Sequence, residues 1–257
     1  MKRLTTMIVA IAAVFALLAG CGSNSAEKGN TLVIGVDDHF APMGFRDKDN
    51  NLVGFDIDYA NAAAERMGKE AKFQIIDWST KESELSSGRI DLIWNGYTIT
   101  KERKGKVLFT KPYLENAQVV VTLANSKIEK IDDLAGKVIG LQSLSSASDA
   151  LDKNPIKSKI KSVAEYKDNV LALSDLKTKR VDAVVIDEVV IDYYMSKEKG
   201  KFKLLKGSLA PEQYGIGVKK GNDALLKDLQ KALDEMNEDG TAAEISEKWF
   251  GENKVLH

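Results

Sequence analysis

Residues 90–103 constrain the fold most strongly, because they combine a buried strand, a glycine turn and the start of a helix. The apolar run 90–94 predicts a strand that ends just before Gly96. A helix is predicted to begin near Thr100, with Arg103 in its first turn. In open α/β sheets, ligands bind in the crevice beyond the carboxyl ends of the strands. The segment therefore predicts an anion site in which Arg103 binds the carboxylate of a small molecule.

The rest of the chain alternates short apolar runs with helical patterns. The runs 31–36 and 181–186 predict buried strands, the segment 214–218 predicts one further strand, and 223–237 predicts a long helix. Strands that alternate with helices are typical of an α/β protein, and we expect mainly parallel sheets.

A short internal echo suggests that the chain folds into two similar parts. The residues Arg-Ile-Asp-Leu-Ile at 89–93 correspond to Arg-Val-Asp-Ala-Val at 180–184, and each run ends at polar residues. Two matching strands are too few for an internal repeat. They do suggest two lobes whose polar strand ends face a shared cleft.

The first 20 residues predict a bacterial lipoprotein signal peptide. A positively charged start precedes the apolar run 7–18, which is too short for a comfortable membrane span. The run ends in Leu-Ala-Gly-Cys, which resembles a lipobox, in which Cys21 is lipidated and becomes the mature N-terminus. The alternative is an ordinary secretory signal with an incidental cysteine. Residues 21–30 are small and polar, as expected for a flexible tether.

The composition argues against nucleic-acid binding and against several enzyme classes. The chain has 37 basic and 38 acidic residues, whereas a nucleic-acid-binding domain usually carries a basic excess. Cys21 is the only cysteine, so a thiol nucleophile in the folded part is excluded, and the only histidines are His39 and His257. G-x-S-x-G, H-E-x-x-H, Walker and G-x-G-x-x-G motifs are absent. We expect no catalytic residue, no cofactor and no metal. Asp37 and Asp38 could form a metal-ligand pair, but adjacent acids in a loop are commoner as solvated turn residues.

Three other segments place polar or aromatic side chains beside predicted strand ends. Residues 143–146 offer serine hydroxyls and helix N-terminal N–H groups to an anion, although simple N-capping is an equal alternative. Asp187 ends a buried strand, where an unpaired charge would be costly, so it either caps the next helix or binds a cationic group. Phe40 and Trp78 follow strands and could flank a ligand side chain, although loop packing would also explain them.

Several spaced motifs together resemble one family, the extracellular solute-binding proteins of the polar amino acid ABC importers (solute-binding family 3). Residues 54–58, followed by an alanine-rich helix, are similar to the family signature, although Tyr59 departs from its usual aliphatic residue. Residues 98–103 are similar to its T-I-T-x-E-R motif. Further matches follow in order at 140–147, 181–188 and 239–251. The resemblance covers residues 31–251.

The resemblance implies a periplasmic-binding-protein-like fold. Two α/β lobes are joined by two crossing strands that serve as a hinge, and the ligand lies in the cleft between the lobes. Matching by motif places lobe 1 at 31–117 plus 215–257, and lobe 2 at 118–214.

The resemblance also implies a role for each candidate residue. Arg103 is expected to clamp the α-carboxylate of the ligand, and Asp187 is expected to bind its α-ammonium group. The expected supporting groups are the N–H of Gly96 or Thr98, the N–H of Ser146 beside Ser145, the Asn95 carbonyl and the Thr98 hydroxyl. Gly96 occupies a position that is serine in some members, so a hydroxyl contact is lost there.

Four residues are expected to surround the ligand side chain. Phe40 and Trp78 should flank it, while Asp37 and Gln142 occupy positions where the family often tunes side-chain choice. Two aromatic rings with Asp37 and Gln142 suit a guanidinium or an ammonium group, which favours arginine or lysine. Glutamine, histidine and cystine stay open as alternatives, because aromatic walls also hold neutral side chains.

The expected function is that of the substrate-binding component of an ABC importer, which captures a polar L-amino acid and closes around it by a hinge motion. We expect a monomer, lipid-anchored at Cys21 outside the cell membrane, whose partners are a membrane permease and its ATPase. One alternative is an extracytoplasmic dehydratase on the same fold, for which His39 and Asp37 are the only hints of an acid or base. Another alternative is a sensor or adhesin lipoprotein.

Overall fold

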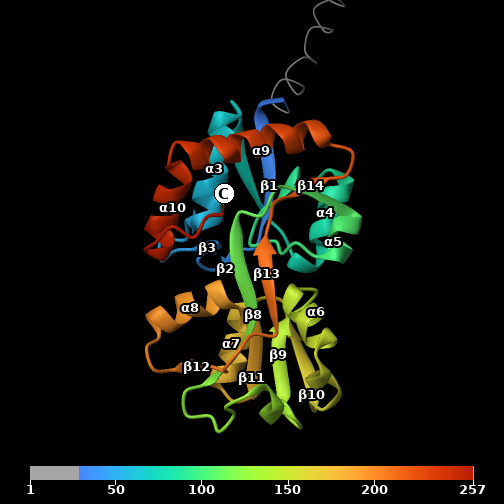
Figure 1. Ribbon diagram of the computed structural model, residues 1–257, viewed down its shortest axis with the longest axis vertical. Helices are drawn as coiled ribbons and strands as arrows, with labels where there is room; N and C mark the ends of the chain where they lie inside the picture. The colour runs from blue at the N-terminus through green and yellow to red at the C-terminus, as the bar shows by residue number, and fades with distance from the viewer. Residues whose placement is uncertain (1–28, 257) are drawn as a thin grey trace, which may run out of the picture.

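The computed structural model describes residues 29–256. They form two α/β lobes, stacked one above the other and each built on its own sheet (Figure 1). The predicted signal peptide and the lipidation site Cys21 lie outside the described residues. Within 29–256, no helix combines the length and the apolar character that a membrane span requires.

Lobe 1 is built on a five-stranded mixed sheet. In spatial order, its strands are β5 (Glu70–Ile75), β1 (Thr31–Val36), β6 (Leu92–Ile93), β14 (Gly217–Lys219) and β7 (Val107–Phe109). β1 pairs in parallel with β5 and β6, whereas β14 runs antiparallel to both β6 and β7. β1, β5, β6 and β7 therefore run in one direction, as expected for a mainly parallel sheet, and β14 alone is reversed, because it enters the sheet from the other lobe.

Helices cover the sheet of lobe 1, and a small antiparallel sheet lies beside it. The helices are α3 (Phe55–Arg66), η1 (Trp78–Thr80), α4 (Lys81–Ser87), α5 (Lys101–Lys106), α9 (Asp223–Glu238) and α10 (Thr241–Phe250), and the small sheet is β2 (His39–Phe40), β3 (Gly44–Arg46) and β4 (Leu52–Val53). Gly54 precedes α3 with a φ of +145°, and a Cβ there would lie 2.1 Å from the Met43 carbonyl oxygen. Only glycine fits this close approach, which explains its place in the signature.

Lobe 2 is built on a six-stranded sheet that is also mixed. Its strands are β10 (Ser162–Tyr166), β9 (Val138–Gln142), β11 (Ala183–Asp187), β8 (Leu114–Leu123) and β12 (Phe202–Leu204), with β13 (Ala210–Tyr214) paired to β8. The helices are η2 (Ile131–Leu134), α6 (Ser146–Lys153), η3 (Pro155–Ser158), α7 (Asn169–Lys177) and α8 (Glu188–Lys197). β9 pairs in parallel with β10 and β11, and β8 pairs antiparallel with β11, β12 and β13.

Strands β8 and β13 run side by side between the two lobes (Figure 1). The prediction of one strand over 214–218 is wrong, because β13 ends at Tyr214 and β14 begins at Gly217 in the other sheet. Gly215 lies at this change of sheet, and a Cβ there would lie 2.8 Å from the Ile99 side chain. The expected lobe boundary at 117/118 falls inside β8, and the lobe boundaries themselves stay a prediction.

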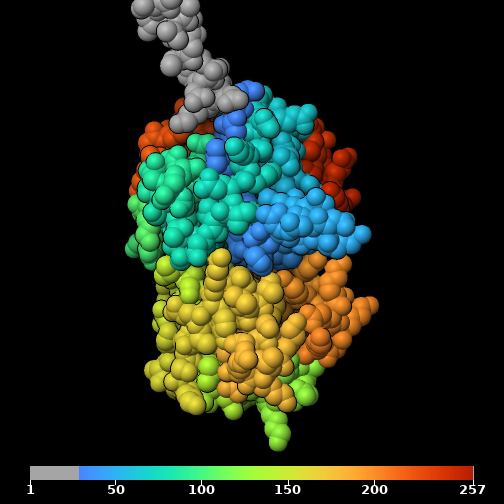
Figure 2. Space-filling model, turned by 180° about the vertical axis from the view of Figure 1, so that it is seen from behind, coloured from blue at the N-terminus to red at the C-terminus, as the bar shows by residue number. Residues whose placement is uncertain are grey.

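The two lobes are in contact in this structure. Seen from behind, they meet along a line that crosses the molecule without a visible gap (Figure 2). The strand ends that were expected to face a cleft therefore lie against one another, and the side chains between them are buried.

Candidate functional site

Side chains from the two lobes form hydrogen bonds at the carboxyl ends of the strands. Asp37 directly follows β1, and its Oδ2 accepts a hydrogen bond from Nε2 of Gln142, the last residue of β9, at 2.9 Å. The Thr98 and Ser146 hydroxyl oxygens lie 3.1 Å apart. All four side chains are buried. The sequence-predicted residues of both lobes are thus brought together at one place.

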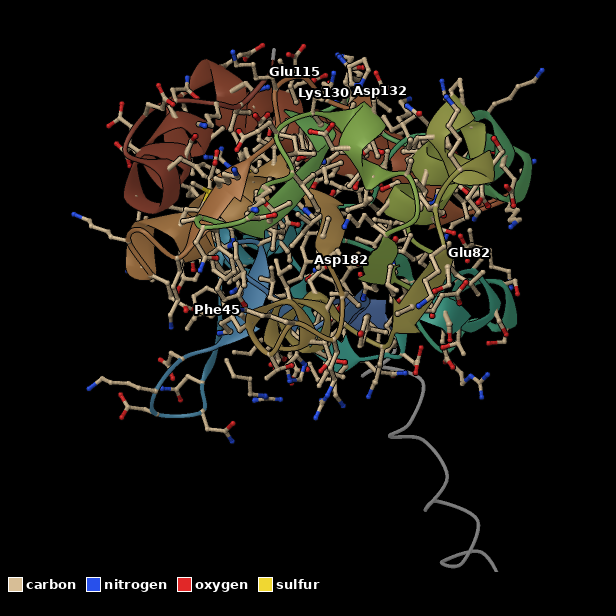
Figure 3. All side chains as sticks on the ribbon, turned by 90° about the horizontal axis from the view of Figure 1, so that it is seen from below. Phe45, Glu82, Glu115, Lys130, Asp132 and Asp182 are labelled. Carbon is tan, nitrogen blue, oxygen red and sulfur yellow. The ribbon has the colours of Figure 1, made fainter. Side chains whose placement is uncertain are left out.

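Contacts between the lobes flank this place on two sides. On one side, the ring of Phe45 lies 5.4 Å from the ring of Tyr193 in α8. On the other side, Lys81 Nζ donates a hydrogen bond to the Leu144 carbonyl oxygen at 3.0 Å. Phe45 and Glu82, the neighbour of Lys81, mark these opposite sides in Figure 3. The predicted site residues are enclosed between these two contacts.

Arg103 lies inside this enclosure as expected. Thr100 caps α5 and accepts a hydrogen bond from the Arg103 N–H, which fixes the arginine in the first turn. The guanidinium carbon lies 4.7 Å from the Tyr97 ring centroid, and Nη1 donates to the Thr98 carbonyl oxygen at 3.0 Å. Arg103 is only 5% exposed, and no carboxylate among residues 29–256 forms an ion pair with it. Most of its N–H donors therefore remain free for an anion.

The turn at Gly96 is held by Asp56, a buried acid of the 54–58 segment. Asp56 Oδ2 accepts a hydrogen bond from the Gly96 N–H at 2.7 Å and another from the Tyr113 hydroxyl at 3.1 Å. Burial raises the pKa of Asp56 to about 7. Gly96 has a φ of +56°, and a Cβ there would lie 2.7 Å from Phe40 Cε1. Glycine is thus required here for two reasons, because the backbone is left-handed and because a Cβ would clash with Phe40. A serine would meet both problems, whatever hydroxyl contact it could offer.

Asp187 lies at the end of β11 and faces the crossing strands. It is the N-cap residue of α8, but its side chain makes no capping hydrogen bond, so the capping alternative is wrong. Its Oδ1 accepts hydrogen bonds from Asn116 Nδ2 at 2.7 Å and from the Tyr214 hydroxyl at 2.6 Å. Burial raises the pKa of the Asp187 carboxyl. The carboxylate is held in place by neutral donors and has no ion-pair partner among residues 29–256.

The serines before α6 do not cap it with their side chains. Ser145 is the N-cap residue without a side-chain capping bond, and its hydroxyl donates instead to the Gln142 carbonyl oxygen at 2.7 Å. The Ser146 hydroxyl lies against Thr98 and accepts a hydrogen bond from Gln118 Nε2 at 3.1 Å. The N-capping alternative is therefore wrong, and Ser146 is the serine that faces the other lobe.

The aromatic and amide candidates are buried beside the polar groups. Phe40 contacts the Gly96 turn, as the space around that glycine requires. Trp78 packs edge-on against Tyr97, with ring centroids 5.9 Å apart, and within residues 29–256 no ring contact joins Phe40 to Trp78. Both amide atoms of the Asn95 side chain are buried without a hydrogen-bond partner. Loop packing, the alternative to a role in ligand binding, therefore explains part of the surroundings of Phe40 and of Trp78.

Asp37, Asp38 and His39 are the one group within residues 29–256 whose side chains could together ligate a metal ion. Their ligand atoms lie within 4.8 Å of one another. The two carboxylates are already bound, however, because Asp37 accepts from Gln142 and Asp38 accepts from Arg46 Nε at 2.7 Å. Burial raises the pKa of Asp37. We assign no metal to this group.

Several buried polar residues of the site were missed by the sequence analysis. They are Asp56, Lys81, Asn116, Gln118 and Tyr214, together with the half-buried Glu212. Glu212 lies on β13 opposite Asn116, and the alternation of polar side chains on 116/118 and 212/214 could have indicated one polar face. Lys81 gave no such signal, since a lysine at a helix start usually lies in solvent.

Comparison with known proteins places this arrangement in context. The family model of the bacterial extracellular solute-binding proteins, family 3, matches residues 32–252. The L-cystine-binding protein TcyJ of Escherichia coli strain K12 is 31% identical over 230 residues, covering 89% of this chain and 85% of that protein. The arginine-binding extracellular protein ArtP of Bacillus subtilis strain 168 is 31% identical over 259 residues, covering 97% of this chain and 98% of that protein.

Solved structures show the same architecture. An ABC uptake transporter substrate-binding protein from Streptococcus pneumoniae with bound histidine has a TM-score of 0.87 and 38% identity, covering 93% of this chain and 100% of that chain. An ancestral arginine-binding protein bound to arginine has a TM-score of 0.82 and 40% identity, covering 86% and 99%. The two-lobed α/β fold expected from the sequence is therefore confirmed.

Proposed function

Because this chain belongs to the bacterial extracellular solute-binding proteins, family 3, we propose that it binds one polar α-amino acid between its lobes and delivers it to an ABC importer. Similar proteins are named for binding cystine, arginine and glutamine. The partners in this proposal are a membrane permease and its ATPase. A monomer with a lipid anchor at Cys21 would keep the binding lobes close to that permease.

The observation that carries this proposal is the buried Arg103, whose guanidinium has no carboxylate partner within residues 29–256. A guanidinium binds a carboxylate through two parallel hydrogen bonds, so the α-carboxylate of an amino acid suits it. The N–H groups at Thr98 and Ser146 are the proposed additional donors. An anion at this position would remove the cost of a buried, unpaired cation.

Asp187 in the other lobe complements Arg103. Its carboxylate is held by two neutral donors and is proposed to bind the α-ammonium group, together with the Asn95 carbonyl and the Thr98 hydroxyl. An amino acid head group would thus join a residue of lobe 1 to a residue of lobe 2. Such a ligand stabilises the arrangement with the lobes in contact, which is the state that a permease would recognise.

The side-chain pocket is proposed to lie between Phe40, Trp78, Asp37 and Gln142. A carboxylate beside aromatic rings suits a cationic side chain, and this favours arginine or lysine. Both oxygens of the Asp37 carboxylate already accept a hydrogen bond, Oδ1 from the His39 N–H and Oδ2 from the Gln142 side-chain amide. A guanidinium or ammonium group would share this carboxylate with Gln142.

A thermal-shift screen against the twenty common L-amino acids and L-cystine tests the proposal. A ligand that binds the folded state raises the melting temperature, and we expect L-arginine or L-lysine to give the largest rise. Arg103→Ala and Asp187→Asn should remove the rise. A screen without any shift would contradict amino acid binding, whereas the largest shift with another amino acid would contradict only the side-chain preference.

A further inference from the structure

The site contains a second acid that the family resemblance does not assign. Glu212 lies on β13 directly opposite Asn116 of β8. Asn116 Nδ2 lies 2.7 Å from Asp187 Oδ1 and 3.1 Å from Glu212 Oε2, so one amide group donates to both carboxylates. Tyr214, two residues along the same strand, donates its hydroxyl to Asp187. Strands β11 and β13, which both pair with β8, thus bring two carboxyl groups to one place.

Glu212 also lies where the two lobes meet. Its Oε2 accepts a hydrogen bond from the Thr98 hydroxyl of lobe 1 at 3.0 Å. Gln118 Nε2 donates to the same oxygen at 3.1 Å, and the Ser146 hydroxyl of lobe 2 lies 3.4 Å from it. Thr98 and Ser146 are residues that were expected to contact the ligand head group. Glu212 therefore lies within reach of the same head group.

The two acids lack a cation. Among residues 29–256, every side chain that donates a hydrogen bond to Asp187 or Glu212 is a neutral amide or hydroxyl, and no lysine, arginine or histidine forms an ion pair with either. Burial, followed by repulsion from Asp187, raises the pKa of Glu212 to about 7. A buried acid and a half-buried acid that share one amide are a costly arrangement unless a positive group lies between them.

We propose that Glu212 is a second acid of the head-group site, and that the α-ammonium group of the bound amino acid lies between Asp187 and Glu212. This inference rests on the proposed function. An ammonium group has three N–H donors, and the two carboxylates with the Thr98 hydroxyl supply three acceptors, so Glu212 takes the place given above to the Asn95 carbonyl. Asp187 and Glu212 carry two negative charges and Arg103 carries one positive charge. The site therefore keeps one net negative charge when a zwitterionic head group is bound. The site should therefore prefer neutral or cationic amino acids to acidic ones.

Glu212→Gln tests this inference, because the amide keeps the size of the side chain and its acceptor oxygen but removes the charge. The probes are L-arginine, L-histidine, L-glutamine and L-cystine, titrated by calorimetry into the wild type and the variant. We expect the wild type to bind at least one of them and the variant to bind it at least tenfold more weakly. The matched control is Glu115→Gln, an exposed residue of β8 opposite Gln213, which lies at the margin of the molecule in Figure 3. The control should bind like the wild type.

A second set of probes separates charge pairing from a general effect on the site. These are the matching acids without the α-amino group, such as 5-guanidinopentanoate for L-arginine. If Glu212 pairs with the α-ammonium group, Glu212→Gln should lower the affinity for the amino acid but change the affinity for the deaminated acid less than twofold. An equal loss for both probes, or no loss for either, would overturn the inference. If the wild type binds none of the amino acids, the proposed function fails first and the inference fails with it.

The wild type alone provides the test if the variant does not fold. The ratio of the affinities for the amino acid and its deaminated acid should rise at least threefold from pH 6 to pH 8, as Glu212 loses its proton. The other groups near Glu212 are Asp187, the fixed charge of Arg103 and the Tyr214 phenol, whose pKa burial raises well above its usual value. Asp56 also titrates near pH 7, but it bonds the backbone of the turn and affects both probes alike. A ratio that does not change with pH would overturn the inference.

Discussion

Lys81 of lobe 1 donates a hydrogen bond to the Leu144 carbonyl oxygen of lobe 2, with 3.0 Å between nitrogen and oxygen. The same ammonium group donates to the Trp78 carbonyl oxygen at 3.0 Å. Lys81 is only 2% exposed, and burial lowers its pKa to about 8. Leu144 has a φ of +52°, an uncommon conformation for leucine that turns its carbonyl into this contact. A charged side chain thus ties the lobes together beside the proposed ligand.

Lys81→Met should favour separation of the lobes. The methionine keeps the apolar length of the side chain but loses the bond to Leu144, and hydrogen bonds to charged groups contribute about 1.5–3 kcal/mol. Since the proposed binding closes the lobes on the ligand, we expect the affinity for an amino acid to fall about tenfold or more. Small-angle X-ray scattering without ligand should give a larger radius of gyration than for the wild type.

Lys104→Met is the control for this change, since Lys104 is an exposed residue of α5. It should leave both the affinity and the radius of gyration unchanged. If Lys81→Met behaved like this control, the bond to Leu144 would have no part in holding the lobes together.

Replacement of Gly96 by alanine should destabilise the fold and weaken binding. A left-handed backbone costs a residue with a Cβ about 1–2 kcal/mol, and here the Cβ would also press on the Phe40 ring at 2.7 Å. We expect urea unfolding to show a loss of about 1–3 kcal/mol. Gly105→Ala in α5 is the control, since nothing lies within 4 Å of its added Cβ, and it should be neutral or stabilising. Equal stabilities for Gly96→Ala and the wild type would contradict the strain argument.

The sequence was informative about Arg103 because its setting is local. The strand end, the glycine and the Thr100 cap all lie within a few residues of it, so short-range patterns were enough. Asp187 was singled out for the same reason, at the end of an apolar run, although its hydrogen-bond partners Asn116 and Tyr214 come from distant strands. Those partners were beyond the reach of local patterns.

Lys81 could not be predicted in this way, and for Glu212 the signal was limited to the alternation of polar side chains at 116/118 and 212/214. The strand β13 contains Pro211 and several polar residues, so its pattern did not indicate a strand before Tyr214. The contacts of Glu212 with Thr98 and of Lys81 with Leu144 join residues that are 114 and 63 positions apart. Whether such a charge lies in solvent or between lobes depends on the packing of two sheets, which no local pattern contains.

Arg103→Lys should weaken amino acid binding by at least tenfold even though the charge is kept. Lysine is a point charge without the planar pair of donors that matches a carboxylate, so it loses the proposed two-bond contact. Calorimetry with L-arginine and L-histidine measures the change. The control is Arg89→Lys, an arginine whose side chain is 62% exposed and pairs with Glu84. Wild-type affinity in Arg103→Lys would contradict the assignment of a bidentate carboxylate contact.

Asp56→Asn should reduce the pH dependence of stability. Burial raises the pKa of Asp56 from 3.8 to about 7, so the folded state holds this proton more tightly than the unfolded chain does. The stability that this group contributes is therefore fully present below pH 3.8 and is lost as the pH rises through 7. Between pH 5 and pH 8 the wild type should lose about 2–3 kcal/mol from this carboxyl alone.

The measurement is urea unfolding of both proteins at pH 5 and pH 8. Asparagine cannot ionise, but its amide oxygen still accepts from the Gly96 N–H and the Tyr113 hydroxyl, so the turn should keep its position. Burial also raises the pKa of Asp187 and of Glu212, but both residues are present in both proteins, so their effect on stability cancels in the comparison. The stability of the wild type relative to the variant should thus fall as the pH rises. A difference that stayed constant would mean that Asp56 carries the same charge in the folded and unfolded states, and that burial does not govern its ionisation.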